Sequence, residues 1–95
     1  MEEVNSEIKR KFDKYISKVK ELEDINDNDK LYLYGNYKQA LLGNINIEKP
    51  SLFEIKATEK WKAWNNLKDI SSETAMKNYI KKVKQLYKLN ENNNK

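Results

Sequence analysis

The sequence has no cysteine and no histidine, and only one proline and two glycines among 95 residues. Without cysteine there is neither a disulfide nor a thiol nucleophile, and without histidine the commonest general base and metal ligand is missing. We therefore expect no hydrolase triad, no catalytic residue and no metal site. The scarcity of proline and glycine, together with apolar residues at helical spacing, predicts an all-α fold.

Long apolar segments are also missing. No run approaches the ~20 residues that a membrane-spanning helix needs, and Met1–Ser6 lack the basic start and apolar centre of a signal peptide. We expect one soluble cytoplasmic domain over residues 1–89, a monomer, followed by a polar low-complexity tail over residues 90–95 that frays. The net charge of +4 suits an anionic partner, but no long basic stripe indicates nucleic acid.

Apolar residues at three- and four-residue steps predict helices over about 5–22, 28–42 and 58–68, and a fourth from Ser71 or Ser72 onward. We expect Asn5 or Ser6 to cap the first helix and Asp27 or Asn28 the second, and Gly43 to end the second. The first and third connections are short, and the second is long. These lengths predict an up-down-down-up four-helix bundle with a long crossover between the parallel second and third helices.

The long connection, residues 43–56, has no helical period, and Pro50 disfavours a helix at the residue before it. Its extended reach of ~45 Å exceeds the ~24 Å length of a helix of this size. The segment can therefore run along the whole bundle. We expect its large apolar side chains to pin it there: Ile45, Ile47, Leu52, Phe53 and Ile55.

Tyr34, Tyr37 and Lys38 share one face of the second predicted helix. Two rings and an ammonium fit a purine nucleotide that carries phosphate, because a ring stacks on the base and the ammonium meets the anion. The alternative is that the tyrosines belong to the core and that Lys38 is solvated, and periodicity alone favours this alternative. Lys60 stands in the first turn of the third predicted helix, where free backbone N–H groups favour an anion.

Aromatic residues in the third and fourth predicted helices follow the apolar spacing. Trp61 and Trp64 are expected in the core. Tyr79 also belongs to the core by spacing, but its hydroxyl needs water or a partner.

Four segments together resemble the acyl-CoA-binding protein family in order and spacing. They are Leu31-Tyr-Leu-Tyr-Gly-Asn-Tyr-Lys-Gln-Ala40, Gly43-Asn-Ile-Asn-Ile-Glu-Lys-Pro50, Lys60-Trp-Lys-Ala-Trp-Asn-Asn-Leu-Lys68 and Ala75-Met-Lys-Asn-Tyr-Ile80. The resemblance runs from about Phe12 to Leu86. The family fold is an up-down-down-up four-helix bundle, which agrees with the topology expected from the connection lengths. The sequence departs from the family pattern at Asp69, where a glycine is common after the third helix.

The resemblance implies a role for each candidate residue. Tyr37 would flank the adenine, while Tyr34, Lys38 and Lys60 would hold the ribose 3′-phosphate. Tyr79 would pack against the nucleotide, and Lys20 would meet the nucleotide or pyrophosphate. Ile16 and Leu31 would line the path of the acyl chain.

The function that follows from the resemblance is non-catalytic binding, buffering and transport of long-chain acyl-CoA, which is the ligand rather than a cofactor. Transient contact with a membrane is left open, and nucleic acid is not an expected partner. Two alternatives remain: a helical module for nucleic acid or another anion, and a purely structural interaction bundle. Nucleic-acid binding would require a continuous basic face and a steep salt dependence.

Overall fold

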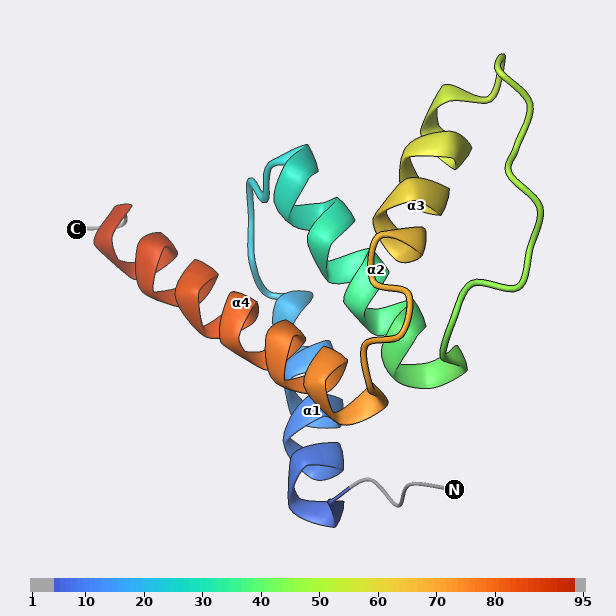
Figure 1. The fold of residues 1–95 in the computed structure, drawn as a ribbon. Coiled ribbons are helices and arrows are strands. Elements are labelled where there is room, and N and C mark those ends of the chain that lie inside the picture. The colour runs from blue at the N-terminus through green and yellow to red at the C-terminus, as the bar shows by residue number, and fades with distance from the viewer. Residues whose placement is uncertain (1–4, 94–95) are drawn as a thin grey trace.

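The structure is a computed structural model and describes residues 5–93. In this range the chain forms four helices: α1 (Ser6–Val19), α2 (Asp27–Leu42), α3 (Ile55–Asn65) and α4 (Ser72–Asn93). α1 and α4 run in one general direction and α2 and α3 in the other, and the long α2–α3 connection returns along the outside of α3 (Figure 1). The predicted all-α, up-down-down-up bundle is confirmed. Within residues 5–93, no helix is both long and apolar enough to cross a membrane.

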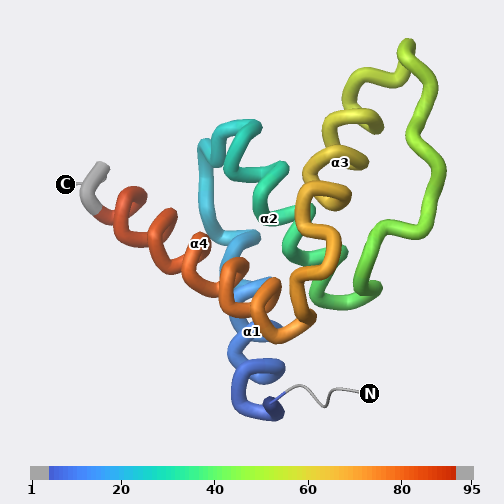
Figure 2. The backbone as a smooth tube through the Cα atoms, in the orientation of Figure 1, coloured from blue at the N-terminus to red at the C-terminus, as the bar shows by residue number. Residues whose placement is uncertain are grey.

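The helices pack as a thin layer. α2 and α4 are in contact with each other, and α1 packs on α4 while α3 packs on α2 (Figure 2). The Cα atoms extend over 44 × 37 × 16 Å, so the molecule is much thinner than it is wide. Such a shape leaves broad faces on which side chains from several helices can meet.

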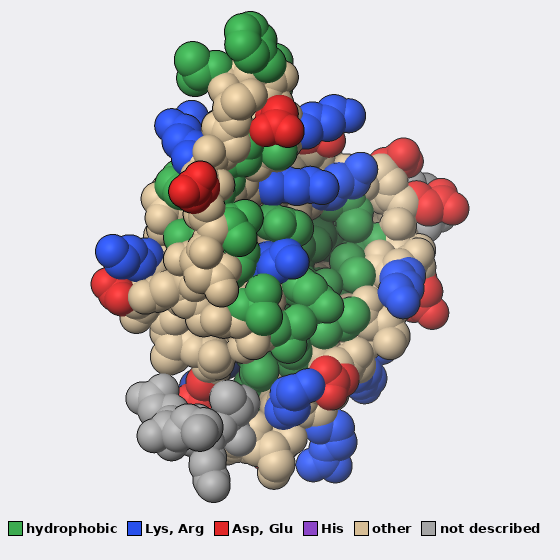
Figure 3. Space-filling view, turned by 90° about the vertical axis from the view of Figure 1, so that its right-hand side faces the viewer, with side chains coloured by type: hydrophobic (Ala, Val, Ile, Leu, Met, Phe, Trp, Pro, Cys, Tyr) green, Lys and Arg blue, Asp and Glu red, His purple; other side chains and the backbone are tan. Residues whose placement is uncertain are grey.

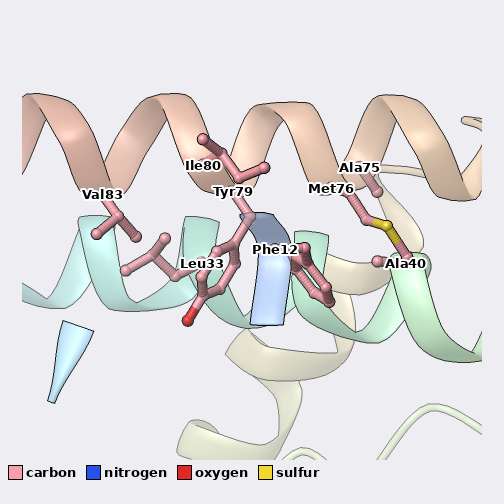
Figure 4. Packing of buried hydrophobic residues seen from close by; sticks show 8 residues of the cluster. All are labelled: Phe12, Leu33, Ala40, Ala75, Met76, Tyr79, Ile80 and Val83. Atoms are coloured by element: carbon pink, nitrogen blue, oxygen red, sulfur yellow. The ribbon is translucent and has the colours of Figure 1, made fainter. Parts of the chain in front are cut away.

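The core lies where α1, α2 and α4 come together (Figure 4). Phe12 of α1 is fully buried, and it meets α4 side chains such as Tyr79, with Leu33 of α2 beside them. Burying such side chains contributes ~1.5–3 kcal/mol each. The buried apolar residues of this cluster are Phe12, Leu33, Ala40, Ala75, Met76, Tyr79, Ile80 and Val83.

The first two helices differ from prediction at their ends. Asn5 caps α1 as expected, since its side chain accepts a hydrogen bond of 2.8 Å from the Glu7 backbone N–H. α1 ends at Val19, however, three residues early. Asn26 caps α2 by accepting from the Asp29 N–H at 2.8 Å, so the expectation of Asp27 or Asn28 is wrong. Gly43 ends α2 with φ 75°, a conformation that a glycine adopts without strain.

The last two helices are also displaced from their predicted ranges. α3 covers Ile55–Asn65 rather than 58–68, and a turn that ends with Asp69 at φ 71° follows it. A glycine suits position 69 because it adopts this left-handed conformation without strain. An Asp can replace it there because Asp tolerates the conformation better than most residues do. Ser71 caps α4 as expected, with its Oγ 3.1 Å from the Thr74 N. α4 continues to Asn93, so residues 90–93 of the expected polar tail belong to this helix, and 94–95 lie outside the described residues. That the tail frays stays a prediction.

The α2–α3 connection is held by hydrogen bonds rather than by its apolar side chains. Trp64 Nε1 donates to the Gly43 carbonyl oxygen at 2.8 Å, and Trp61 Nε1 donates to that of Ile47 at 2.9 Å. Trp64 is buried as predicted, whereas Trp61 is only half-buried. Four of the five apolar residues expected to pin the connection are exposed, so that prediction is wrong for Ile47, Leu52, Phe53 and Ile55; Ile45 alone is half-buried.

At Gly35 the backbones of α2 and α3 approach each other so closely that there is no room for a side chain. A Cβ atom added to Gly35 would lie 2.6 Å from the carbonyl oxygen of Ala63 and 2.9 Å from its carbonyl carbon. Such contacts are shorter than van der Waals distances, and the clashing atoms belong to a helix backbone that cannot rotate away. Glycine is therefore required here for close approach rather than for an unusual backbone angle.

We predict that Gly35→Ala destabilises the fold by about 1–3 kcal/mol, the usual range for overpacking, even though alanine is the better helix former by ~1 kcal/mol. Chemical denaturation monitored by circular dichroism measures this difference. A Gly35→Ala protein that is more stable than the wild type would show that helix propensity outweighs the clash and would contradict the close approach.

Candidate functional site

Tyr34, Lys38 and Lys60 form one group, which we call the lysine–tyrosine cluster. The Lys38 Nζ lies 5.7 Å from the centroid of the Tyr34 ring, and the Lys60 Nζ lies 5.6 Å from the same centroid. Tyr34 and Lys38 come from one face of α2, and Lys60 comes from α3, so the close approach at Gly35 brings them together. Each ammonium is at a distance at which the ring quadrupole attracts it.

Among the described residues, no acidic side chain forms an ion pair with this cluster. The ion pairs in the described part of the chain engage neither Lys38 nor Lys60, and use instead Lys9, Lys11, Lys77 and Lys82. Lys38 is half-buried and Lys60 is exposed. Two like charges held beside one ring favour the binding of an anion, which would relieve their mutual repulsion.

Lys60 reaches the cluster by a different route from the one that its position in the sequence indicated. Because α3 begins at Ile55, Lys60 stands in the second helical turn, and the prediction that it lies in the first turn is wrong. The free N–H groups of the helix terminus are therefore not what makes Lys60 a candidate for binding an anion. Lys60 is a candidate because its ammonium lies beside the Tyr34 ring.

Tyr37 and Tyr79 form a second group with Phe12. The Tyr37 and Tyr79 ring centroids are 6.4 Å apart, and those of Phe12 and Tyr79 are 5.2 Å apart in an edge-on arrangement. Tyr79 is only 5% exposed. Burial, and secondarily the charge of Tyr37, raises the pKa of the Tyr79 hydroxyl above its ordinary value of 10.0.

α2 joins the two groups, because Tyr37 and Lys38 follow Tyr34 by three and four residues and so share its face of the helix. On the side toward α3 this face meets Lys60, and on the side toward α1 and α4 it meets Phe12 and Tyr79. Figure 3 shows a broad face of the molecule on which hydrophobic side chains gather in a hollow with Lys or Arg side chains in and around it. Such a surface offers both charge and apolar contact to one ligand.

The two candidates for contact with an acyl chain lie in different surroundings. Leu31 lines a cavity of about 520 Å³ between α2 and α3, with Tyr32, Ala63 and Leu67 among its other lining residues. Ile16 is half-buried and packs against the core cluster from α1. The structure places Leu31, but not Ile16, in that cavity.

Lys20 belongs to neither group of side chains. It is exposed, and it follows α1 as the C-cap residue, with its backbone N–H donating to carbonyl oxygens of the last turn. In the described part of the chain, its ammonium takes part in none of the ion pairs or cation–π contacts. By contrast, the Nζ of Lys18 lies 5.5 Å from the centroid of the Tyr87 ring.

Trp64 belongs beside the lysine–tyrosine cluster, which the sequence interpretation missed by assigning it only to the core. The Lys38 Nζ lies 5.9 Å from the centroid of the Trp64 ring, so this ammonium is near two aromatic faces. The signal was available, because Trp64 follows Lys60 by four residues and therefore shares its face of the helix.

These features define a small helical binding module. Within residues 5–93, no group of three His, Cys, Asp or Glu side chains is placed to hold a metal ion. The chemistry of the site comes instead from lysines, tyrosines and apolar surface.

Comparison with known proteins identifies the family. Residues 9–83 match the family model described as acyl CoA binding protein. The chain is 44% identical over 80 residues to acyl-CoA-binding domain-containing protein 2 of Oryza sativa subsp. japonica, covering 83% of this chain and 88% of that protein. It is 42% identical over 80 residues to an acyl-CoA-binding protein of Ricinus communis, covering 83% and 89%. The chain therefore belongs to the acyl-CoA-binding protein family, a family of non-catalytic binding proteins.

Other matches extend this result. Over 76 residues the chain is 47% identical to acyl-CoA-binding domain-containing protein 3 of the same rice subspecies, covering 79% of this chain but only about half, 49%, of that protein. The fold matches a crystal structure of Oryza sativa acyl-CoA-binding protein 2 with a TM-score of 0.86 at 41% identity, covering 88% and 92% of the two chains. It also matches a structure from Moniliophthora perniciosa with a TM-score of 0.80 at 34% identity, covering 85% and 81%.

The raised pKa of Tyr79 predicts a loss of stability in alkali. Because the folded state binds this proton more tightly than the unfolded state, its contribution is complete below about pH 10 and is lost as the pH rises through the folded-state pKa. Calorimetric unfolding at pH 8 and at pH 11 should therefore show a larger drop in Tm for the wild type than for Tyr79→Phe. Equal drops in the two proteins would show that the Tyr79 hydroxyl is not the group that titrates.

Proposed function

We propose that this chain binds long-chain acyl-CoA thioesters reversibly, and buffers and carries them without chemical change. The observation that carries the proposal is the lysine–tyrosine cluster, in which two ammonium groups approach one tyrosine ring with no carboxylate paired to either among the described residues. Membership of the family, and the names of the relatives, support the same ligand.

The cluster suits the nucleotide end of coenzyme A. In our proposal the ribose 3′-phosphate accepts charge-assisted hydrogen bonds from Lys38 and Lys60, and the Tyr34 hydroxyl donates a further one. Tyr37 flanks the adenine, since an aromatic face stacks on any base. Tyr79, whose ring lies beside that of Tyr37, packs against the nucleotide. We assign Lys20 to the nucleotide or pyrophosphate region, on the grounds of the family resemblance.

The acyl chain needs an apolar path. Each CH₂ group removed from water contributes ~0.8 kcal/mol, so covering a long chain adds affinity that increases with its length. We propose that Leu31, which lines the cavity between α2 and α3, contacts this chain. Ile16 contributes from α1 on the side toward the core.

We further propose that the protein acts as a monomer in the cytoplasm and meets membranes only transiently, where acyl-CoA is taken up or released. We expect that nucleic acid is not a partner. The mixed distribution of 19 basic and 15 acidic residues supports that exclusion, because nucleic-acid binding favours a continuous basic face.

The lysine pair gives a direct test. Lys38→Ala and Lys60→Ala should each weaken the binding of palmitoyl-CoA by about 1–3 kcal/mol, because each removes a hydrogen bond to a charged group. Isothermal titration calorimetry measures the affinities. The matched control is Lys81→Ala, an exposed lysine on α4 that lies well away from the direction of Tyr79 around that helix. If Lys81→Ala weakens binding as much as the other two, only net charge matters and the cluster is not the site.

Leu31 gives a second test. In the wild type, affinity should rise from octanoyl-CoA to palmitoyl-CoA, because more CH₂ groups leave water. Leu31→Ser should reduce this dependence on chain length while leaving the affinity for free coenzyme A unchanged. Calorimetry with the acyl-CoA series measures both quantities. A parallel loss for all ligands would place Leu31 in the support of the nucleotide site rather than on the acyl path.

A further inference from the structure

The turn before α3 presents large apolar side chains to solvent. Phe53 is 95% exposed and Leu52 is 87% exposed, and Ile55 beside them is 68% exposed. In Figure 1 this part of the chain forms the projecting end of the molecule, at the top of the long connection. Single exposed apolar residues are ordinary, but three within four positions at a projection are not. We call Leu52, Phe53 and Ile55 the apolar tip.

The backbone beneath the apolar tip is held in a defined conformation. The Glu54 N–H donates to the Ser51 carbonyl oxygen at 3.0 Å, and the Ser51 N–H donates to the Glu54 carboxylate at 3.2 Å. The Thr58 hydroxyl donates to the same Ser51 oxygen at 3.4 Å. This closed turn leaves Leu52 and Phe53 at its outer side. Their exposure is therefore a property of an ordered turn and not of a loose loop.

The apolar tip is too small to form a stable protein interface by itself. Three side chains expose a few hundred Å², whereas a stable protein interface needs ~800 Å² on each side. A lipid bilayer has no such minimum, because each apolar side chain that enters it gains transfer free energy separately.

The charges around the apolar tip also suit a bilayer. Lys49 and Lys56 flank it in sequence, and neither takes part in the ion pairs of the described residues. Ammonium groups in these positions reach lipid phosphates while apolar neighbours enter the interface. Glu48 and Glu54 offset their charge, so the apolar contacts rather than net charge should dominate.

We propose that the apolar tip inserts into the interface of a phospholipid bilayer and docks the protein there during ligand exchange. Docking on the bilayer does not require the ligand. Its role in ligand exchange rests on the proposed function. α3 begins at the tip with Ile55 and carries Lys60 in its second turn. A protein docked in this way would hold the lysine–tyrosine cluster close to the surface from which a ligand leaves the bilayer.

The test uses the double variant Leu52→Ser/Phe53→Ser, whose two side chains are exposed and so are not needed for folding. Flotation with dioleoylphosphatidylcholine vesicles that contain no acyl-CoA measures docking alone. We expect the variant to partition onto vesicles about tenfold more weakly than the wild type. The matched control is Leu89→Ser, which changes a 54%-exposed leucine toward the far end of α4 and should partition like the wild type.

In this flotation the proposal is overturned by no partition of the wild type, by equal partition of the wild type and the double variant, or by an equal loss with Leu89→Ser. Repeating the flotation in 0.5 M salt separates insertion from simple charge attraction, since only the latter is screened. A difference between the proteins that disappears in salt also contradicts insertion.

A second measurement separates docking from ligand binding. The affinity for palmitoyl-CoA in solution should be the same in the double variant and the wild type, while extraction of palmitoyl-CoA from vesicles should slow several-fold. If the wild type binds no palmitoyl-CoA in solution, the proposed function is wrong. The flotation result would still show whether the apolar tip docks on a bilayer.

Discussion

The contact between α2 and α3 at Gly35 is the constraint on which the rest of the site depends. A helix face without a side chain at this point lets the Ala63 backbone come within a distance that any Cβ would forbid. The consequence is that Lys60 of α3 reaches the Tyr34 ring from one helix while Lys38 reaches it from the other. Close backbone packing thus holds two positive charges near each other, although their mutual repulsion opposes this arrangement.

Polar side chains hold the frame of these helices at the end where α2 stops. The buried Gln39 donates to the Asn44 side chain at 2.9 Å and to the Ile70 carbonyl oxygen at 2.8 Å. Asn44 in turn accepts from the Asp69 N–H at 2.7 Å. These bonds tie the end of α2, the start of the long connection and the α3–α4 turn together. With the indole of Trp64 bonded to Gly43, they fix the crossover that makes α2 and α3 parallel.

The sequence predicted the architecture well, because helical periodicity and connection lengths depend on local spacing. It predicted less well what depends on tertiary contact. The apolar residues of the connection looked like anchors, but Trp61 and Trp64 took that role by hydrogen bonding to the backbone, and Leu52 and Phe53 stayed outside. The meeting of Lys60 with Tyr34 came from the family resemblance, since no spacing within one helix relates α2 to α3. The role of Lys20 remains a prediction.

We propose that one site recognises both halves of an acyl-CoA, the charged nucleotide and the apolar chain. Calorimetric titration of the wild type with palmitoyl-CoA, free coenzyme A and palmitate tests it most directly. We expect tight binding of the thioester, weak binding of coenzyme A, and little or no binding of the free acid. Equal affinity for palmitate and palmitoyl-CoA would contradict the nucleotide site, and no binding of palmitoyl-CoA would contradict the function as a whole.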